Sequence, residues 1–228
     1  MTVQNLYNNL MNFTKEHQVK DFTLEQYTFR FTNKFESYVI YWYGIPVGNA
    51  KNGLCGGMSL ASILYYKYKI VTPKNNITPS IKTDPQLFTF IINCQVASLT
   101  VKALFNYFRF MFTAKSTDAK ELSNQYPIIM QTIDTDTPVL VGLIRAKASF
   151  FNPKTWLNII QHHQVVAYKY ILQEKTITFH IYDPDSPGAD MAITIDRDNL
   201  DITATGWLNP IYTLFAISFN YNKKPPVV

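Results

Sequence analysis

The sequence predicts an α+β fold in which a helical first half packs against an antiparallel sheet formed by the second half. Apolar residues recur every three to four positions over much of residues 55–134, which is the period of helices that pack on a core. After residue 137 the chain changes to short segments rich in β-branched and aromatic residues, separated by turn signals. With 228 residues, 47% hydrophobic and 16% charged, the chain can bury a core. A cleft is expected where the two layers meet.

Residues 1–25 are expected to form an N-terminal helical extension. Apolar side chains at helical spacing predict a helix over residues 2–17. Aromatic and polar residues then alternate over residues 27–31, which is typical of a half-buried strand. Glycine, proline and asparagine are frequent within residues 39–52, and this composition predicts a surface loop.

Four helices are predicted in the next part of the chain, so that residues 26–135 are mostly helical. The first begins at Cys55, directly after a glycine-containing loop. The pair Asp84-Pro85 has the residue types that open a helix. The remaining two helices are expected over residues 98–112 and 118–134.

The second half is predicted to form the antiparallel sheet, over residues 136–222. Its four β-rich segments are residues 138–144, 164–171, 176–182 and 212–219. Two consecutive prolines make residues 223–228 a tail, because proline cannot continue a central strand. No internal repeat or linker divides the chain, so residues 1–228 are expected to form a single domain.

Composition excludes several classes of function. Two cysteines and four histidines supply neither a disulfide framework nor a convincing zinc cage, and no phosphate-binding glycine loop is present, so we expect no metal and no cofactor. The net charge of +5 is diffuse, and the aromatic residues are not interleaved with clustered lysine or arginine, which argues against a nucleic-acid partner. Polar residues interrupt the most apolar window, residues 87–112, so no integral membrane segment is expected.

The N-terminus lacks the apolar core and the cleavage site of a secretory signal. We therefore expect a cytoplasmic protein, or one that is exported by a signal-independent route as an effector would be. The oligomeric state is not predicted by any feature of the sequence.

Cys55 is the first candidate for chemistry. It lies between glycines in Gly53-Leu54-Cys55-Gly56-Gly57, where a loop becomes a helix. A helix N-terminus stabilises a thiolate, and the glycines leave the sulfur accessible. The alternative is a buried structural cysteine beside a turn. The second cysteine, Cys94, lies in an apolar run and is expected to be a core residue.

Two further residues complete a possible nucleophilic site. His163 lies at the entrance to a predicted strand, and Asp183 ends the next strand directly before Pro184. Either residue alone is more often structural. Together with Cys55 they supply the parts of an activated cysteine nucleophile: a thiol, a base and a carboxylate that orients the base.

These residues occur in three short motifs, GLCGGMS, HQVVAY and IYDPDSPG, and in this order the sequence resembles the papain-like cysteine peptidase superfamily. It is similar in particular to a microbial branch with a G-x-C-G-G-M segment. The resemblance implies a papain-like fold in which Cys55 is the nucleophile, His163 is the general base and later acid, and Asp183 orients the imidazole. It also implies a protein or peptide substrate and an acyl-enzyme intermediate.

Alternatives exist at each position of the site. His162 adjoins His163, but strand alternation and the H-Q-V frame favour His163. Asp185 competes with Asp183, which ends the strand directly. Papain relatives often carry a glutamine six residues before the nucleophile, and the residue at that place here is Asn49. Asn49 is therefore a candidate for the oxyanion hole, together with the backbone N–H of Cys55.

Asn33 is a second candidate for the oxyanion hole, and for both asparagines a purely structural role in a turn is at least as plausible. The leading function is a papain-like cysteine peptidase or thiol hydrolase that cleaves peptide or amide bonds. An alternative is a deamidase, transglutaminase or acyltransferase that uses the same triad on a partner protein. A further alternative is a catalytically silent binding module.

Overall fold

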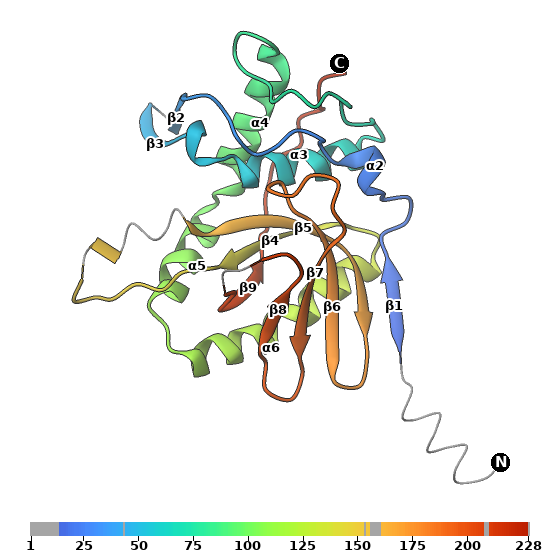
Figure 1. Cartoon of the computed structure of the whole chain (residues 1–228), viewed down its shortest axis with the longest axis vertical. Helices are drawn as coiled ribbons and strands as arrows, with labels where there is room; N and C mark the ends of the chain where they lie inside the picture. Colours follow the sequence, from blue (N-terminus) through green and yellow to red (C-terminus); the bar gives the residue numbers. More distant parts are fainter. Residues whose placement is uncertain (1–13, 43, 153, 156–160, 208–209, 228) are drawn as a thin grey trace, which may run out of the picture.

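The structure is a computed structural model that describes residues 14–42, 44–152, 154–155, 161–207 and 210–227. It combines helices with antiparallel strands, which confirms the α+β class (Figure 1). The helices are α2 (Leu24–Tyr27), the 3-10 turn η1 (Ala50–Asn52), α3 (Cys55–Lys67), α4 (Pro85–Ser98), α5 (Val101–Met111) and α6 (Lys115–Asp134). The strands are β1 (Lys15–Gln18), β2 (Val39–Trp42), β3 (Ile45–Asn49), β4 (Val139–Ile144), β5 (His163–Leu172), β6 (Thr176–Tyr182), β7 (Met191–Asp196), β8 (Ile202–Ala204) and β9 (Thr213–Ala216).

The larger sheet is built around β5, the longest strand, and follows the order β8-β7-β6-β5-β4-β9. β4 pairs with the first half of β5, and β1 pairs with its second half along the same edge. On the other edge, Val166 of β5 pairs with Tyr182 of β6. This register brings the start of β5 next to the end of β6, so that His163 and Asp183 lie close together.

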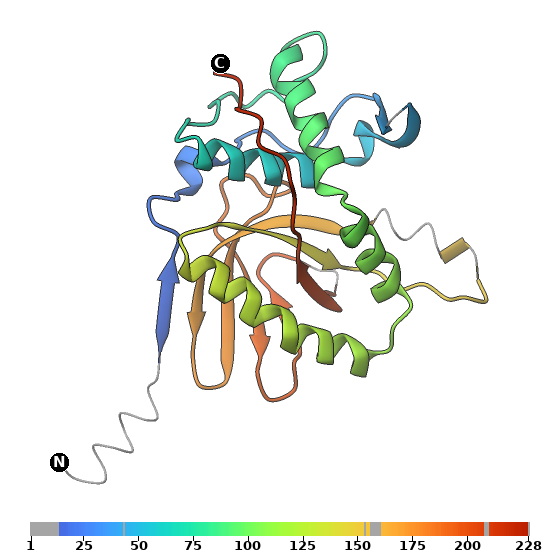
Figure 2. The same ribbon diagram turned by 180° about the vertical axis from the view of Figure 1, so that it is seen from behind.

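Helices cover the sheet in two places. α6 crosses one face and contacts β9, β5 and β4, as the view from behind shows (Figure 2). α3 packs against both β5 and α4, and its side chains from Gly56 to Tyr66 are buried. β4 is buried along its whole length, as its apolar sequence VLVGLI requires. The start of α3 is therefore held rigidly against β5, the strand that carries His163.

Several expected elements are confirmed. α3 begins at Cys55, and α4 begins at Pro85 with the Asp84 carboxylate accepting the N–H of Leu87 at 3.0 Å. All four predicted strands are present as β4, β5, β6 and β9, and β6 has the predicted bounds. The predicted helix over residues 98–112 is shorter, because Thr100 caps it, and the helix predicted over residues 118–134 begins earlier, at Lys115. β7 and β8 were not predicted.

The expected N-terminal helical extension is wrong where the structure describes it. Residues 1–13 lie outside the described residues, but Lys15–Gln18 forms β1 and pairs with Lys169–Leu172 of β5. β4 ends its pairing at Ala167 of β5 and leaves the edge beyond it unpaired. Backbone pairing to this edge makes residues 15–18 a strand, whereas the apolar residues whose spacing predicted the helix lie within residues 1–13.

The predicted strand over residues 27–31 is also wrong. Tyr27 is the last residue of α2, and residues 28–31 belong to no strand. Phe29 and Phe31 are buried and Arg30 is exposed. Tyr27 and Thr28 are buried as well, so the aromatic residues of this segment are core residues without strand alternation.

The predicted surface loop over residues 39–52 is instead largely a hairpin of β2 and β3, ending in η1. The hairpin is exposed, as expected of a loop, and Gly44 makes its turn with φ of +82°. Pro46 is tolerated because the sheet has two strands, so every strand in it is an edge.

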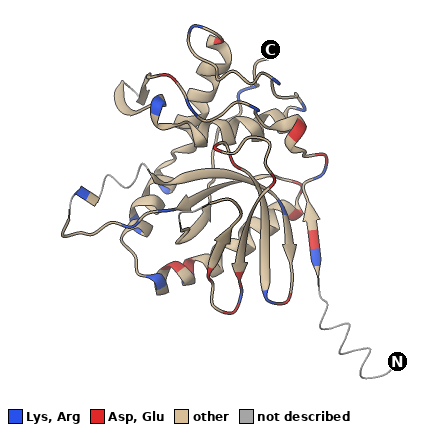
Figure 3. Ribbon diagram, in the orientation of Figure 1, with Lys and Arg blue, Asp and Glu red and all other residues tan. Residues whose placement is uncertain are grey.

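Charged residues are scattered over the described chain (Figure 3), in line with the diffuse charge of the sequence. Among the described residues, no single helix has the length and apolar character needed to cross a membrane. The pair α4 and α5 meets that test together, with a 63° bend between the two helices.

Candidate active site

Cys55 is the first residue of α3, so its side chain lies at a helix N-terminus. Gly53, two residues earlier, has φ of +92°, a conformation that glycine adopts readily. A Cβ atom at Gly53 would lie 2.7 Å from Nδ2 of Asn33, so the turn also needs the space that glycine leaves. Cys55 is partly exposed. The helix end therefore presents the sulfur where free N–H groups and the helix dipole stabilise a thiolate.

His163 and Asp183 form a buried pair beside this helix end. Nε2 of His163, the first residue of β5, lies 2.6 Å from Oδ1 of Asp183, which directly follows β6. The side chains are 5% and 0% exposed. Burial by itself would lower the pKa of His163, but the Cys55 thiolate and the Asp183 carboxylate outweigh this effect and raise it to about 10. The imidazole therefore favours its protonated form.

The Cys55 thiol and the His163 ring lie close enough for their charges to interact. Because Nε2 faces Asp183, Nδ1 is the ring nitrogen that remains for the sulfur. The structure thus brings together the three residues that the sequence singled out, in the order thiol, imidazole and carboxylate.

Asp183 is fixed by two further donors. Its Oδ2 accepts the indole N–H of Trp207 at 2.8 Å, and its Oδ1 accepts the backbone N–H of Asp185 at 2.9 Å. Burial opposes ionisation of Asp183, but the hydrogen bonds from His163, Asp185 and Trp207 together lower its pKa. The Trp207 ring also meets the His163 ring edge-on at 5.9 Å. Sequence reasoning missed Trp207, because a single tryptophan in a turn carries no signal of such a contact.

The two competing residues lie outside the triad. The His162 ring stacks on Tyr107 with centroids 5.3 Å apart, and its Nδ1 accepts the backbone N–H of Arg145 at 3.4 Å. Burial, with a contribution from Lys147, lowers the pKa of His162 to about 4. Asp185 is half exposed, with Oδ2 3.8 Å from Nε2 of His163. It adds negative charge near the pair without displacing Asp183.

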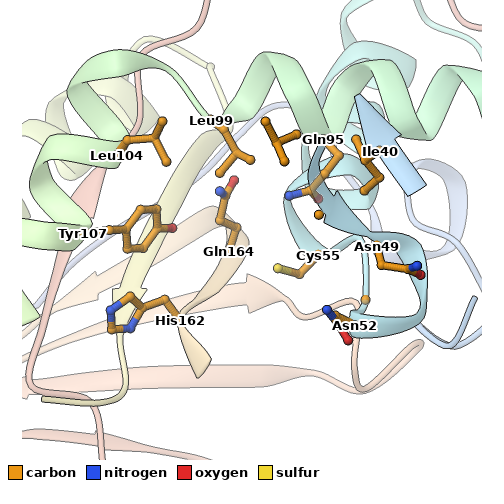
Figure 4. A pocket seen from close by; sticks show the side chains of 13 residues that line it. Ile40, Asn49, Asn52, Cys55, Gln95, Leu99, Leu104, Tyr107, His162 and Gln164 are labelled. Atoms are coloured by element: carbon orange, nitrogen blue, oxygen red, sulfur yellow. The ribbon is translucent and has the colours of Figure 1, made fainter. Parts of the chain in front are cut away.

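Asn49 lies near the site, but its amide has structural partners. Its Oδ1 caps η1 through the N–H of Lys51 at 3.0 Å and accepts the N–H of Tyr38 at 3.1 Å, while Nδ2 donates to Ser37 at 3.1 Å. In Figure 4 this amide points away from Cys55, whereas the Asn52 amide lies closer to it. An oxyanion role for Asn49 therefore requires its amide to turn, and Asn52 is a candidate that the sequence did not suggest.

Asn33, the other candidate, bridges the two halves of the site. Its Oδ1 accepts the N–H of Leu54 at 2.5 Å, and its Nδ2 donates to Asp185 at 2.9 Å. One side chain thus ties the residue before Cys55 to the turn that follows Asp183. This is a positioning role rather than a contact with the sulfur.

We expect Asn33→Ala to lower the free energy of unfolding by about 1–3 kcal/mol, because it leaves the Leu54 N–H without its acceptor in a buried setting. Urea unfolding followed by circular dichroism measures the change. The matched control is Asn76→Ala at an exposed position, expected to change stability by less than about 0.5 kcal/mol. Equal effects of the two substitutions would show that the bridge contributes nothing.

His163, Asp183 and Asp185 are also the residues that could hold a metal ion, since one ligand atom from each lies within 4.8 Å of the others. A cation there would have to replace the hydrogen bond between His163 and Asp183. Both oxygens of Asp183 already accept hydrogen bonds. The hydrogen bonds within this cluster therefore explain why the three side chains lie together.

A cavity of about 240 Å³ opens beside Cys55 (Figure 4). It lies between the β2–β3 hairpin, the start of α3, the α4–α5 corner and the start of β5. The thirteen residues that line it are Ile40, Val47, Gly48, Asn49, Asn52, Gly53, Cys55, Gln95, Leu99, Leu104, Tyr107, His162 and Gln164. The cleft predicted between the helices and the sheet is therefore present, and the nucleophile candidate lies in its wall.

Close approach by neighbouring groups explains why Gly56 and Gly57 follow the cysteine. A Cβ at Gly56 would lie 2.6 Å from Oε1 of Gln164, and a Cβ at Gly57 would lie 2.4 Å from the backbone oxygen of Ile91. Gln95 Oε1 accepts the Gly57 N–H at 2.7 Å. Sequence reasoning missed both glutamines, although the glycine pair was a signal of close approach by other groups.

Comparison with models of known protein families, with characterised proteins and with solved structures finds no match to this chain.

Proposed function

We propose that this protein is a thiol hydrolase of the papain-like cysteine peptidase type, which cleaves a peptide or related amide bond through Cys55. The observation that carries the proposal is the buried His163–Asp183 pair, whose imidazole interacts electrostatically with Cys55 at the start of α3. A structural cysteine has no need of a buried imidazole whose second nitrogen is held by a carboxylate. The resemblance of the three sequence motifs to that superfamily agrees with this assignment.

The first half of the reaction forms the acyl-enzyme. The Cys55 thiolate attacks the substrate carbonyl carbon, and the negative charge moves to the carbonyl oxygen. The backbone N–H of Cys55, at the start of α3, is placed to stabilise this oxyanion. Protonated His163 then gives its Nδ1 proton to the amine nitrogen, the C–N bond breaks, and the amine leaves.

The second half releases the acid product. Neutral His163 accepts a proton from water, the resulting hydroxide attacks the thioester carbonyl, and the C–S bond breaks. Asp183 keeps the ring oriented throughout by accepting from Nε2, while Trp207 keeps that carboxylate in place. Both proton transfers use the same His163 ring, which Asp183 already holds.

The reaction products distinguish peptide hydrolysis from deamidation and transglutamination. We expect a mixture of unrelated peptides incubated with the protein to acquire new amino termini, detected by mass spectrometry, and Cys55→Ala to remove them. Release of ammonia or incorporation of an added amine, without new amino termini, would instead assign a deamidase or transglutaminase. Unchanged products with Cys55→Ala would remove Cys55 from the mechanism.

Alkylation by iodoacetamide tests the activated thiol without a substrate. A neighbouring imidazolium stabilises a thiolate, so we expect iodoacetamide to label Cys55 at neutral pH at least about tenfold faster in the wild-type protein than in His163→Ala. Mass spectrometry of the digested protein follows each cysteine separately.

Cys94 is the internal control for this measurement. It is 0% exposed, and burial raises the pKa of its thiol. It is therefore expected to stay unlabelled while the protein is folded. If Cys55 labels equally fast in the wild-type protein and in His163→Ala, the site is not activated and the binding-module alternative gains support.

A further inference from the structure

Apart from Cys55, the described lining of the cavity beside it is uncharged. The thirteen described residues around it include no aspartate, glutamate, lysine or arginine. His162 is neutral near pH 7, because burial and Lys147 lower its pKa to about 4. Away from the Cys55 sulfur, a charged group entering this cavity would lose its hydration without meeting an opposite charge, which costs several kcal/mol. The lining therefore selects an uncharged occupant.

Two amide side chains line the cavity, the first being Gln95 of α4. Its Oε1 accepts the N–H of Gly57 in the first turn of α3, at 2.7 Å. A backbone N–H can only donate, so the amide cannot turn over without losing this bond. The NH₂ group of Gln95 is consequently the end that is left to donate toward the cavity (Figure 4).

The second amide belongs to Gln164 of β5, which is 3% exposed. The Tyr107 hydroxyl beside it donates to the backbone oxygen of His163 at 3.3 Å. Oε1 of Gln164 is buried and has no hydrogen-bond partner among the described residues. An unpaired buried acceptor is costly, and a bound donor would relieve that cost.

The two amides meet at one place. Gln164 Oε1 lies against Gly56 and the Gln95 side chain lies against Gly57, the two residues that follow Cys55. A donor and an acceptor thus converge next to the nucleophile, within a cavity whose lining is otherwise uncharged. A primary carboxamide offers the complementary pair, an NH₂ group for Gln164 Oε1 and a carbonyl oxygen for the Gln95 NH₂ group.

We propose that this cavity binds the side-chain carboxamide of a glutamine or asparagine in the substrate, next to the bond that Cys55 attacks. The inference rests on the proposed function, because it names the substrate class of the same site. The volume of about 240 Å³ suits one amino-acid side chain, since sites for larger organic ligands have about 300–1,000 Å³. Leu99 and Leu104 line the cavity beside the amides and supply apolar contact for the methylene groups of such a side chain.

A matched series of active-site probes tests this assignment. Each of four dipeptidyl acyloxymethyl ketones carries Gln, Glu, Leu or Lys next to the ketone. Each alkylates an activated thiol at a rate that increases with its affinity for the site. We expect the Gln probe to modify Cys55 at least about tenfold faster than the Leu, Glu and Lys probes, as judged by mass spectrometry of the intact protein. Gln164→Met keeps the length of the side chain but removes both polar atoms. This variant should reduce the ratio of the Gln rate to the Leu rate to about one.

The control variant is Gln86→Met, at an exposed position of the same helix as Gln95, and it should keep the wild-type ratio. Equal rates with the Gln, Leu and Glu probes on the wild-type protein would overturn the carboxamide inference and leave the nucleophile in place. This comparison needs no variant, so it holds even if Gln164→Met fails to fold. Absence of labelling by all four probes and by iodoacetamide would overturn the proposed function, and the inference with it.

Discussion

Replacing Cys55 by serine is expected to reduce turnover by on the order of 10⁶-fold, measured as the initial rate at which new amino termini appear. Serine keeps the size of the side chain and its place at the start of α3. Its hydroxyl is a far weaker nucleophile, however, and the protonated His163 ring is not suited to remove its proton. The unfolding midpoint should stay close to that of the wild type, because the partly exposed sulfur contributes little buried surface.

His163→Ala is expected to cost nearly as much, and the double variant Cys55→Ser/His163→Ala little more than either single change, because the residues of such a triad act as a unit. Cys94→Ala is the matched control. It removes a buried sulfur in α4 and should lower stability by about 1–2 kcal/mol, but turnover per folded molecule should not change. Additive losses in the double variant would mean that Cys55 and His163 do not act in one step.

The parts of the fold that could be predicted are those with a local signal. Asp84 and Pro85 open α4 because a side-chain cap and a proline at the first helical position are local chemistry. The bounds of β6 could be predicted from the alternation in TITFHIY, because that strand pairs on both edges. The positions of Cys55, His163 and Asp183 at element ends could be predicted for the same reason.

The parts that failed depend on partners far away in the sequence. β1 exists because the edge of β5 beyond Ala167 needs a partner, and nothing within residues 15–18 indicates that. Trp207 reaches Asp183 from a turn 24 residues away, and Gln95 reaches Gly57 across 38 residues. Spacing along the chain carries no information on such contacts. A pair of adjacent glycines inside a helix start is the one local sign that other groups approach closely there.

Gly57→Ala is expected to lower the free energy of unfolding by about 3 kcal/mol or more. This loss is larger than the one expected for Asn33→Ala or Cys94→Ala. Gly57 lies in the first turn of α3, beside Ile91 and Gln95 of α4. A Cβ there would lie 2.4 Å from the backbone oxygen of Ile91, 3.0 Å from its Cγ2 and 3.1 Å from Cβ of Gln95. Backbone cannot rotate away as a flexible side chain can, so the two helices have to separate.

Gly48→Ala is the control, because Gly48 also has an ordinary backbone conformation and a Cβ there would be 3.9 Å from its nearest neighbour. It should change the unfolding free energy by less than about 0.5 kcal/mol in urea. Separation of α3 from α4 would also move the Gly57 N–H away from Gln95, so folded Gly57→Ala should label more slowly with the Gln probe. A Gly57→Ala protein as stable as Gly48→Ala would show that the helices adjust freely, and that the glycine pair is not needed to bring the amides to Cys55.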